Sequence, residues 1–233
     1  MRKHRIALAA AIAATLISTS NAQASQTPDQ IMGRIAAHHV QGWVDNKTPA
    51  PELLHRINQG DRVYVSCSVI AAVGIQSARN HGIPARAVSV VTNGKFDGYN
   101  DGHAMLELKL GGKWVLYDLD MNRVAVDQHG RRIGLAKQLK AGHDRRWRMI
   151  AHDDTRWNYA GTTASFQARL KRIEAQPLAD WYDHVMGVAL VSDGHGGYAY
   201  HGTGRESRRI DAVWPGVYRW VGAGQWRSLN YLN

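Results

Sequence analysis

The sequence predicts a domain in which helices are followed by antiparallel β-strands. An apolar stretch of helical length, 68–80, ends at His81-Gly82 and is followed by Pro84, which are helix stop signals. Two runs with alternating apolar residues, 102–110 and 113–118, flank Gly111-Gly112, a pair typical of a tight hairpin turn. The 233 residues are 44% hydrophobic and 21% charged, which is enough apolar material for a folded core and excludes disorder throughout.

The N-terminus has the pattern of a secretory signal peptide. Arg2, Lys3 and Arg5 precede the apolar run 6–17, and Ala22-Gln23-Ala24 is a small-x-small cleavage sequence. The apolar run is shorter than the roughly 20 residues that a membrane-spanning helix needs. We therefore expect cleavage after Ala24, export to the periplasm or the medium, and a mature chain without a membrane span.

Other elements are predicted from capping, turn and strand signals. Thr27-Pro28-Asp29 begins a helix that continues to Trp43, and a short second helix covers 51–58. The valine-rich run 85–92 is predicted as a strand and 93–101 as a loop. The elements predicted further along are a helix at 165–175, strands at 185–191 and 198–201, and a hairpin of 217–221 with 225–230.

Cys67 is the single cysteine of the chain. Exported proteins usually pair their cysteines in disulfides, so a lone thiol is either a buried small side chain or a nucleophile. The predicted helix places Cys67 at or near its N-terminus. Unpaired backbone N–H groups and the helix dipole there stabilise a thiolate, lowering a thiol pKa from about 8.5 toward 3.5–7.5.

The predicted hairpin brings a histidine close to a carboxylate. With the turn at Gly111-Gly112, His103 is expected to face Asp118 at about 4.5–5.5 Å. A thiol at a helix start, a histidine and an orienting carboxylate are the groups of an activated cysteine. Asp120 is the alternative carboxylate if the register of the hairpin differs.

In these residues the sequence resembles the transglutaminase-like superfamily. The matching pieces are Cys67 at the start of a small-residue helix, the run 82–86, His103-Ala104 with Glu107, and Gly112-Lys113-Trp114 leading to Asp118. The resemblance covers roughly residues 64–121. Family members often carry a glycine two residues before the cysteine and an aromatic residue two after the histidine, where this chain has Val65 and Met105.

The resemblance implies a papain-like α+β core in which the cysteine-bearing helix packs on an antiparallel sheet. It implies Cys67 as nucleophile, His103 as general base and acid, and Asp118 as the residue that orients the imidazole. Gln59 and Tyr64 are the candidates for a second oxyanion donor. We therefore expect an exported peptidase or amidase that works through a thioester; transglutaminase-type acyl transfer to amines and a noncatalytic cell-envelope binding module are the alternatives.

Metal and cofactor chemistry is not expected. The run 118–122 is similar to the opening of a calcium loop, but Arg123 stands where the glycine is needed and His129 where the bidentate glutamate is needed. His38 and His39 are neighbours on the predicted helix and would point in different directions, and no His-Glu-x-x-His motif is present.

The charge of the chain is concentrated in one segment. The predicted mature chain keeps 26 of the 29 basic residues against 19 acidic ones, and 131–172 alone has a net charge of +8. This charge is compatible with an anionic substrate such as cell-wall material, although arginine-rich segments are often simply solvated. No nucleic-acid-binding motif is found. Most tryptophans of the C-terminal region are predicted to pack in the core because the chain has only two phenylalanines. The predicted division is a signal peptide (1–24), a catalytic core with N-terminal helices (25–130) and a basic, tryptophan-rich extension packed on that core (131–233).

Overall fold

The computed structural model describes most of the chain between residues 26 and 192. The described residues are 26–92, 94, 96, 101–151, 163, 164, 167, 168, 171, 177–192, 198–200, 210 and 218–221. The predicted signal peptide, the predicted strand 225–230 and most of the predicted helix 165–175 lie outside these residues. No helix in the described ranges is long and apolar enough to cross a membrane.

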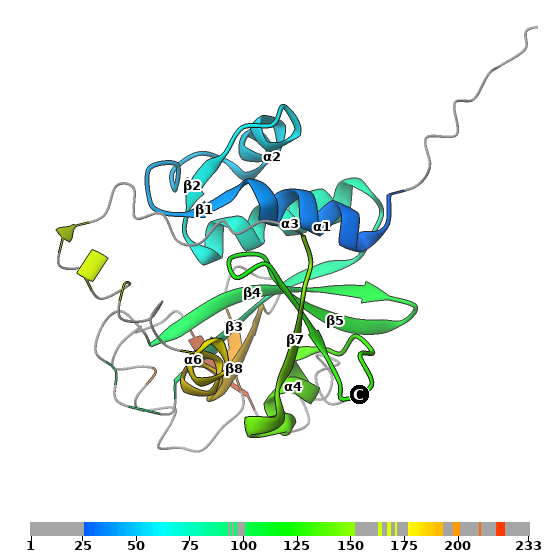
Figure 1. The fold of residues 1–233 in the computed structure, drawn as a ribbon, viewed down its shortest axis with the longest axis vertical. Coiled ribbons are helices and arrows are strands. Elements are labelled where there is room, and N and C mark those ends of the chain that lie inside the picture. The colour runs from blue at the N-terminus through cyan, green and yellow to red at the C-terminus, as the bar shows by residue number, and fades with distance from the viewer. Residues whose placement is uncertain are drawn as a thin grey trace, which may run out of the picture.

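An eight-stranded β-sheet forms the centre of the described structure (Figure 1). The strand order is β10-β9-β8-β3-β4-β5-β6-β7, and all neighbours are antiparallel except β10 and β9. The strands are β3 (Ala85–Val91), β4 (Gly102–Leu110), β5 (Lys113–Asp118), β6 (Arg123–Val126), β7 (Arg146–Met149), β8 (Val188–Ser192), β9 (Tyr198–Tyr200) and β10 (Tyr218–Trp220). The α+β class predicted from the sequence is confirmed.

Three N-terminal helices lie together on one side of the sheet (Figure 1): α1 (Pro28–His38), α2 (Ala50–Asn58) and α3 (Cys67–Asn80). The short parallel strands β1 (His39–Gln41) and β2 (Val63–Val65) lie beside them. Leu106 of β4 packs with the buried side chains of the three helices. Gly74 allows the close approach of α3, since a Cβ there would lie 2.6 Å from Leu119 Cδ1 and 3.2 Å from Leu106 Cδ1. The expected packing of the cysteine-bearing helix on the sheet is confirmed.

A second core lies on the other face of the sheet. The helices α4 (Leu135–Ala141) and α6 (Leu178–Val185) pack there, with a 3-10 turn, η1 (Gly142–Asp144), between α4 and β7. Met105 and Leu116 face this second core because side chains alternate along a strand. Elements that follow residue 131 therefore belong to the same sheet and core, while the division at 130 stays a prediction.

Two predicted elements are wrong at their boundaries. The first helix ends at His38 instead of continuing to Trp43, because His39–Gln41 pairs in parallel with Val63–Val65. The predicted strand 185–191 begins at Val188, and Val185 is instead the last residue of α6. In both places a long-range contact decides the structure against the local pattern.

Several residues of the recognised family motifs hold the fold together. Arg86 and Glu107 are directly opposite each other on β3 and β4. The Arg86 Nε and Nη2 atoms lie 2.8 and 2.6 Å from Glu107 Oε2, and Arg86 also lies 4.0 Å above the Trp114 ring. Glu107 Oε1 accepts a hydrogen bond from the Leu135 N–H at the start of α4. The buried Glu107 thus joins β3, β4 and α4, which is a structural role.

Asp29 at the start of α1 holds this helix to the sheet. The Tyr117 hydroxyl donates to Asp29 Oδ1 at 2.6 Å, and Arg132 and Arg148 donate to Oδ2 at 2.6 and 2.9 Å. Two further arginines of the basic segment, Arg131 and Arg145, also pair with aspartates. Part of the positive charge of the segment 131–172 is therefore neutralised within the fold.

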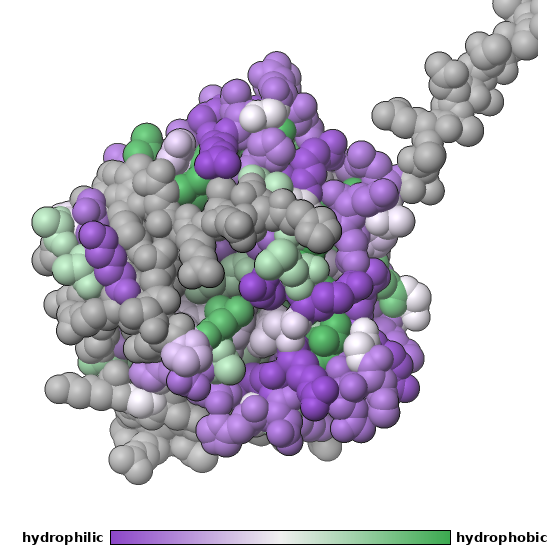
Figure 2. All heavy atoms as spheres, viewed as in Figure 1, coloured by the Kyte–Doolittle hydropathy of each residue, from purple (hydrophilic) through white to green (hydrophobic). Residues whose placement is uncertain are grey.

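Large hydrophobic side chains are seldom exposed in the described part of the chain. Those with more than 40% exposure are Trp43, Val44, Met149 and Trp220. Figure 2 shows a face on which hydrophilic residues predominate and hydrophobic ones form small patches. The expected packing holds for Trp147 and Trp181, which join the second core.

Candidate active site

Cys67 is the first residue of α3, the position expected from the sequence. The side chain is half-buried and makes no disulfide. Ser66 caps the helix without a side-chain bond to it, and its backbone N–H donates to Asn46 Oδ1 at 2.8 Å. This contact fixes the chain where it enters α3 and holds the thiol at the positive end of the helix.

His103 and Asp118 meet on the second face of the sheet. The imidazole Nε2 lies 2.8 Å from Asp118 Oδ2. The prediction that the two residues face each other directly is wrong by two positions. The register of β4 and β5 pairs Leu106 with Tyr117, so that Asp118 lies across from Met105. An offset of two residues keeps both side chains on one face, so the imidazole reaches the carboxylate diagonally.

The Cys67 side chain lies close enough to the same imidazole to act on its pKa. Since Nε2 is engaged with Asp118, Nδ1 is the ring nitrogen left for the thiol. Burial by itself lowers the pKa of His103, but the charge and hydrogen bond of Asp118 and the contact with Cys67 outweigh it and raise this pKa well above 6.5. Burial likewise opposes ionisation of Asp118, yet the hydrogen bonds it accepts, led by the interaction with His103, lower its pKa. The pair therefore favours a carboxylate beside an imidazolium.

Comparison with known proteins identifies a family to which part of the chain is similar. Residues 18–119 match the family model of the transglutaminase-like superfamily. This segment is a transglutaminase-like core. The superfamily includes cysteine peptidases and transglutaminases, so the match supports a cysteine-dependent enzyme family in general. No curated protein matches the chain.

One solved structure is similar to part of the chain. It is a candidate cysteine protease from Cytophaga hutchinsonii, with 23% sequence identity and a TM-score of 0.29. The alignment covers 40% of this chain and 32% of that protein, so this chain spans about a third of its length.

Two residues of α6, outside the transglutaminase-like core, complete the surroundings of His103 and Asp118. The Tyr182 hydroxyl donates to Asp118 Oδ2 at 2.6 Å, and the Trp181 ring meets the His103 ring edge-on at 4.8 Å between centroids. Neither contact is predicted from the sequence, in which Trp181 is expected to pack in the core and Tyr182 has no expected role. The available signal was the amphipathic pattern of 178–185 after Pro177, which identifies a helix but not its partner.

His39 and Asp120 form a second, separate pair near the site. His39 is buried, and its Nε2 lies 3.0 Å from the Val65 carbonyl oxygen and 3.5 Å from Asp120 Oδ1. The structure therefore assigns Asp118, and not the alternative Asp120, to His103. Burial lowers the pKa of His39 to about 4, so this ring is neutral near pH 7.

We expect His39 to make the stability of the transglutaminase-like core depend on pH. Its folded pKa of about 4 is below the ordinary 6.5, so the unfolded chain takes up the proton first as the pH falls. The contribution is complete above pH 6.5 and is lost between pH 6.5 and 4, by about 3 kcal/mol. Urea unfolding of the wild type and of His39→Gln from pH 7 to 4.5 measures this loss as a steeper fall in the wild type.

The exposed His81 provides the control for this measurement. His81→Gln removes a histidine whose Nδ1 lies 2.8 Å from the Ser77 carbonyl oxygen. His39 has a similar contact with the Val65 carbonyl oxygen, but His81 lies at the exposed end of α3. This variant should keep the wild-type slope. Parallel curves for the wild type and His39→Gln would contradict a buried neutral His39.

The two candidates for a second oxyanion donor lie differently. Gln59 follows α2, and its side chain contacts His55 at the exposed surface. Tyr64 lies in β2, where its backbone N–H donates to Asp45 and its side chain is half-buried. The contact of Gln59 is local to α2, and its role as an oxyanion donor stays a prediction. In the ranges that the structure describes, no three His, Cys, Asp or Glu side chains are grouped to hold a metal ion.

Proposed function

We propose that this chain is an exported cysteine-dependent hydrolase of amide bonds, a peptidase or amidase, that works through Cys67, His103 and Asp118. The observation that supports it most is the series of a half-buried thiol, a buried imidazole beside it and a fully buried carboxylate that is hydrogen-bonded to the imidazole. A structural histidine needs no such series, whereas an activated thiol needs each member.

Acylation begins with attack of the Cys67 thiolate on the carbonyl carbon of the amide. The new carbon–sulfur bond turns the carbonyl oxygen into an oxyanion, which the backbone N–H of Cys67 at the start of α3 stabilises. When the carbon–nitrogen bond breaks, the His103 imidazolium gives its proton to the leaving amine. A thioester on Cys67 and a neutral His103 remain.

Deacylation returns the site to its first state. Neutral His103 takes a proton from a water molecule while the hydroxide adds to the thioester carbon. Collapse of this second intermediate breaks the carbon–sulfur bond, releases the carboxylic acid and restores the thiolate beside the imidazolium. Asp118 keeps Nε2 engaged and stabilises the positive ring in both half-reactions.

The expected location and substrate follow from sequence features. Export is supported by the basic start, apolar run and cleavage sequence of the N-terminus. An anionic substrate such as cell-wall peptide is supported by the net charge of +8 in 131–172, reduced by the four arginine–aspartate pairs described above. A peptide or protein amide is therefore the substrate class that we propose.

Trapping of the thioester tests the proposal. The mature chain is incubated with purified muropeptides or casein, with and without hydroxylamine, beside Cys67→Ala. We expect released amine groups in water and hydroxamate with hydroxylamine, and neither in the variant. Turnover that requires an added amine acceptor would make the chain an acyltransferase. Binding of muropeptides without any turnover would replace the proposal by the cell-envelope binding module.

A further inference from the structure

We propose that α6 supplies two positioning residues to this site, Tyr182 for the Asp118 carboxylate and Trp181 for the His103 ring. The inference rests on the proposed function and goes beyond it, because both residues lie after the matched segment 18–119. The site is then built jointly by the transglutaminase-like core and the C-terminal part of the chain.

Tyr182 and His103 share one oxygen of Asp118. The Tyr182 hydroxyl and His103 Nε2 lie 2.6 and 2.8 Å from Oδ2, while the Met121 N–H donates to Oδ1 at 3.1 Å. The Asp118 side chain has no exposure, so water cannot replace any of these donors. Two donors on Oδ2 and one on Oδ1 fix the plane of the carboxylate and the direction in which it presents Oδ2 to His103.

Trp181 covers His103, the donor of the hydrogen bond to Asp118. Its ring meets His103 at an interplanar angle of 77°, and the Trp181 side chain is 4% exposed. Trp147 stacks on Tyr182 with ring centroids 4.0 Å apart and an angle of 15°. These rings keep the hydrogen bond between His103 and Asp118 out of water and restrict the rotation of the imidazole.

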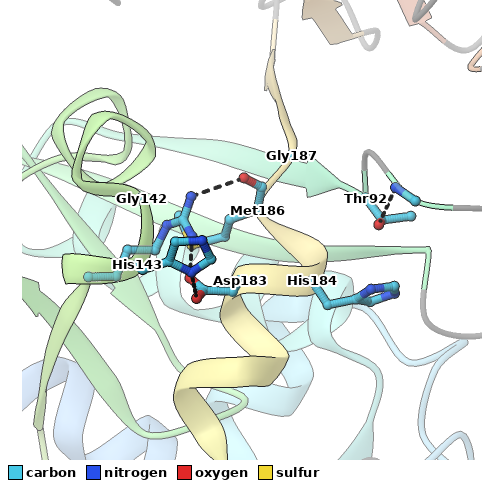
Figure 3. A pocket seen from close by; sticks show the side chains of 9 residues that line it. Thr92, Gly142, His143, Asp183, His184, Met186 and Gly187 are labelled. Carbon is cyan, nitrogen blue, oxygen red and sulfur yellow. Dashed lines mark hydrogen bonds and ion pairs between the residues drawn. The ribbon is translucent and has the colours of Figure 1, made fainter.

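The far side of α6 is anchored to the rest of the fold. A pocket there, lined in part by the residues labelled in Figure 3, has Arg145 in its wall. Arg145 donates through Nη1 to Asp183, through Nε to the Gln138 carbonyl and through Nη2 to the Met186 carbonyl. All three nitrogens of Arg145 hold α6 or its C-terminus to α4, so the helix carrying Tyr182 cannot shift freely.

Sharing of Oδ2 has a measurable consequence for His103. The charged or titratable groups that act on His103 or on Asp118 are these two residues themselves, Cys67 and Tyr182. His39 interacts with both, and Asp120 and Arg123 act on Tyr182. Within this set, Tyr182 donates to the same oxygen as His103 and draws off part of its negative charge. Without the hydroxyl, Oδ2 accepts from His103 alone and stabilises the imidazolium more strongly.

Replacement of Tyr182 by phenylalanine tests the proposal. The full mature chain, labelled at histidine, is titrated by NMR as wild type, Tyr182→Phe and Tyr117→Phe. Tyr117 is the matched control, since it is also a buried tyrosine that donates to a carboxylate at 2.6 Å, but to Asp29. We expect the His103 midpoint to rise by about half a pH unit in Tyr182→Phe only, with a fall in kcat of about tenfold and little change in KM.

An unchanged or lower His103 midpoint in Tyr182→Phe would overturn the proposal. If this variant does not fold, 3-fluorotyrosine incorporated into Tyr117→Phe keeps the Tyr182 hydroxyl and makes it a stronger donor. The His103 midpoint should then move down relative to unfluorinated Tyr117→Phe, and no movement would contradict the proposal. The titration needs no substrate, so the two proposals can fail separately. A shifted midpoint in a protein without turnover would refute the proposed function alone. Turnover with an unshifted midpoint would refute the positioning role alone.

Discussion

Cys67→Ala should abolish amide-bond hydrolysis, with kcat lowered by at least about 10³-fold. The thiol forms the covalent bond of the thioester, and no other cysteine exists in the chain to replace it. His103→Ala should cause a loss of the same order, because the thiol then lacks the base and the leaving amine lacks the acid. The rate at which amine groups are released from muropeptides or casein measures both losses.

The double variant separates a catalytic unit from two independent contributions. Groups that act as a unit lose their effect together, so Cys67→Ala with His103→Ala should be little worse than either alone. Ser68→Ala, at the next and exposed position of α3, is the matched control and should retain activity. Turnover within tenfold of the wild type in Cys67→Ala would contradict the mechanism.

Asp118→Asn should lower kcat by about 10²- to 10⁴-fold. An amide cannot balance the charge of the imidazolium that His103 becomes in each half-reaction, although it retains the shape and part of the hydrogen bonding. The matched change is Asp120→Asn, two residues along the chain. Because Asp120 lies beside His39 and not His103, its replacement should lower kcat less than tenfold. The same amine-release assay compares the two variants, and a larger loss at Asp120 would show that the orienting carboxylate was wrongly assigned.

The sequence predicted those parts of the site that depend on local signals. The start of α3 at Cys67 follows from an apolar stretch with clear stop signals. The hairpin follows from Gly111 and Gly112, whose φ values of 55° and 79° few other residues adopt. Because the turn sets the register, the closeness of His103 and Asp118 could be predicted, and their 2.8 Å contact confirms it. Their catalytic roles stay a prediction.

The parts that could not be predicted depend on contacts between distant segments. Tyr182 lies 64 residues after Asp118, and no pattern in 178–185 indicates which carboxylate its hydroxyl meets. The local sequence predicts His39 in a helix, whereas its pairing with Val63 places it in β1. In both cases the partner, and not the residue's own neighbours in sequence, determines the role.

The central claim is that Cys67 and His103 form one reactive pair, and alkylation of Cys67 by iodoacetamide as a function of pH tests it most directly. An isolated thiol reacts appreciably only toward about pH 8.5 and above. We expect wild-type Cys67 to react readily at pH 6.5 and His103→Ala to lose this reactivity, since the raised pKa of His103 keeps an imidazolium beside the sulfur. Identical profiles near pH 8.5 in both proteins, or no reaction in the folded wild type, would contradict the pair and leave Cys67 as an ordinary or inaccessible thiol.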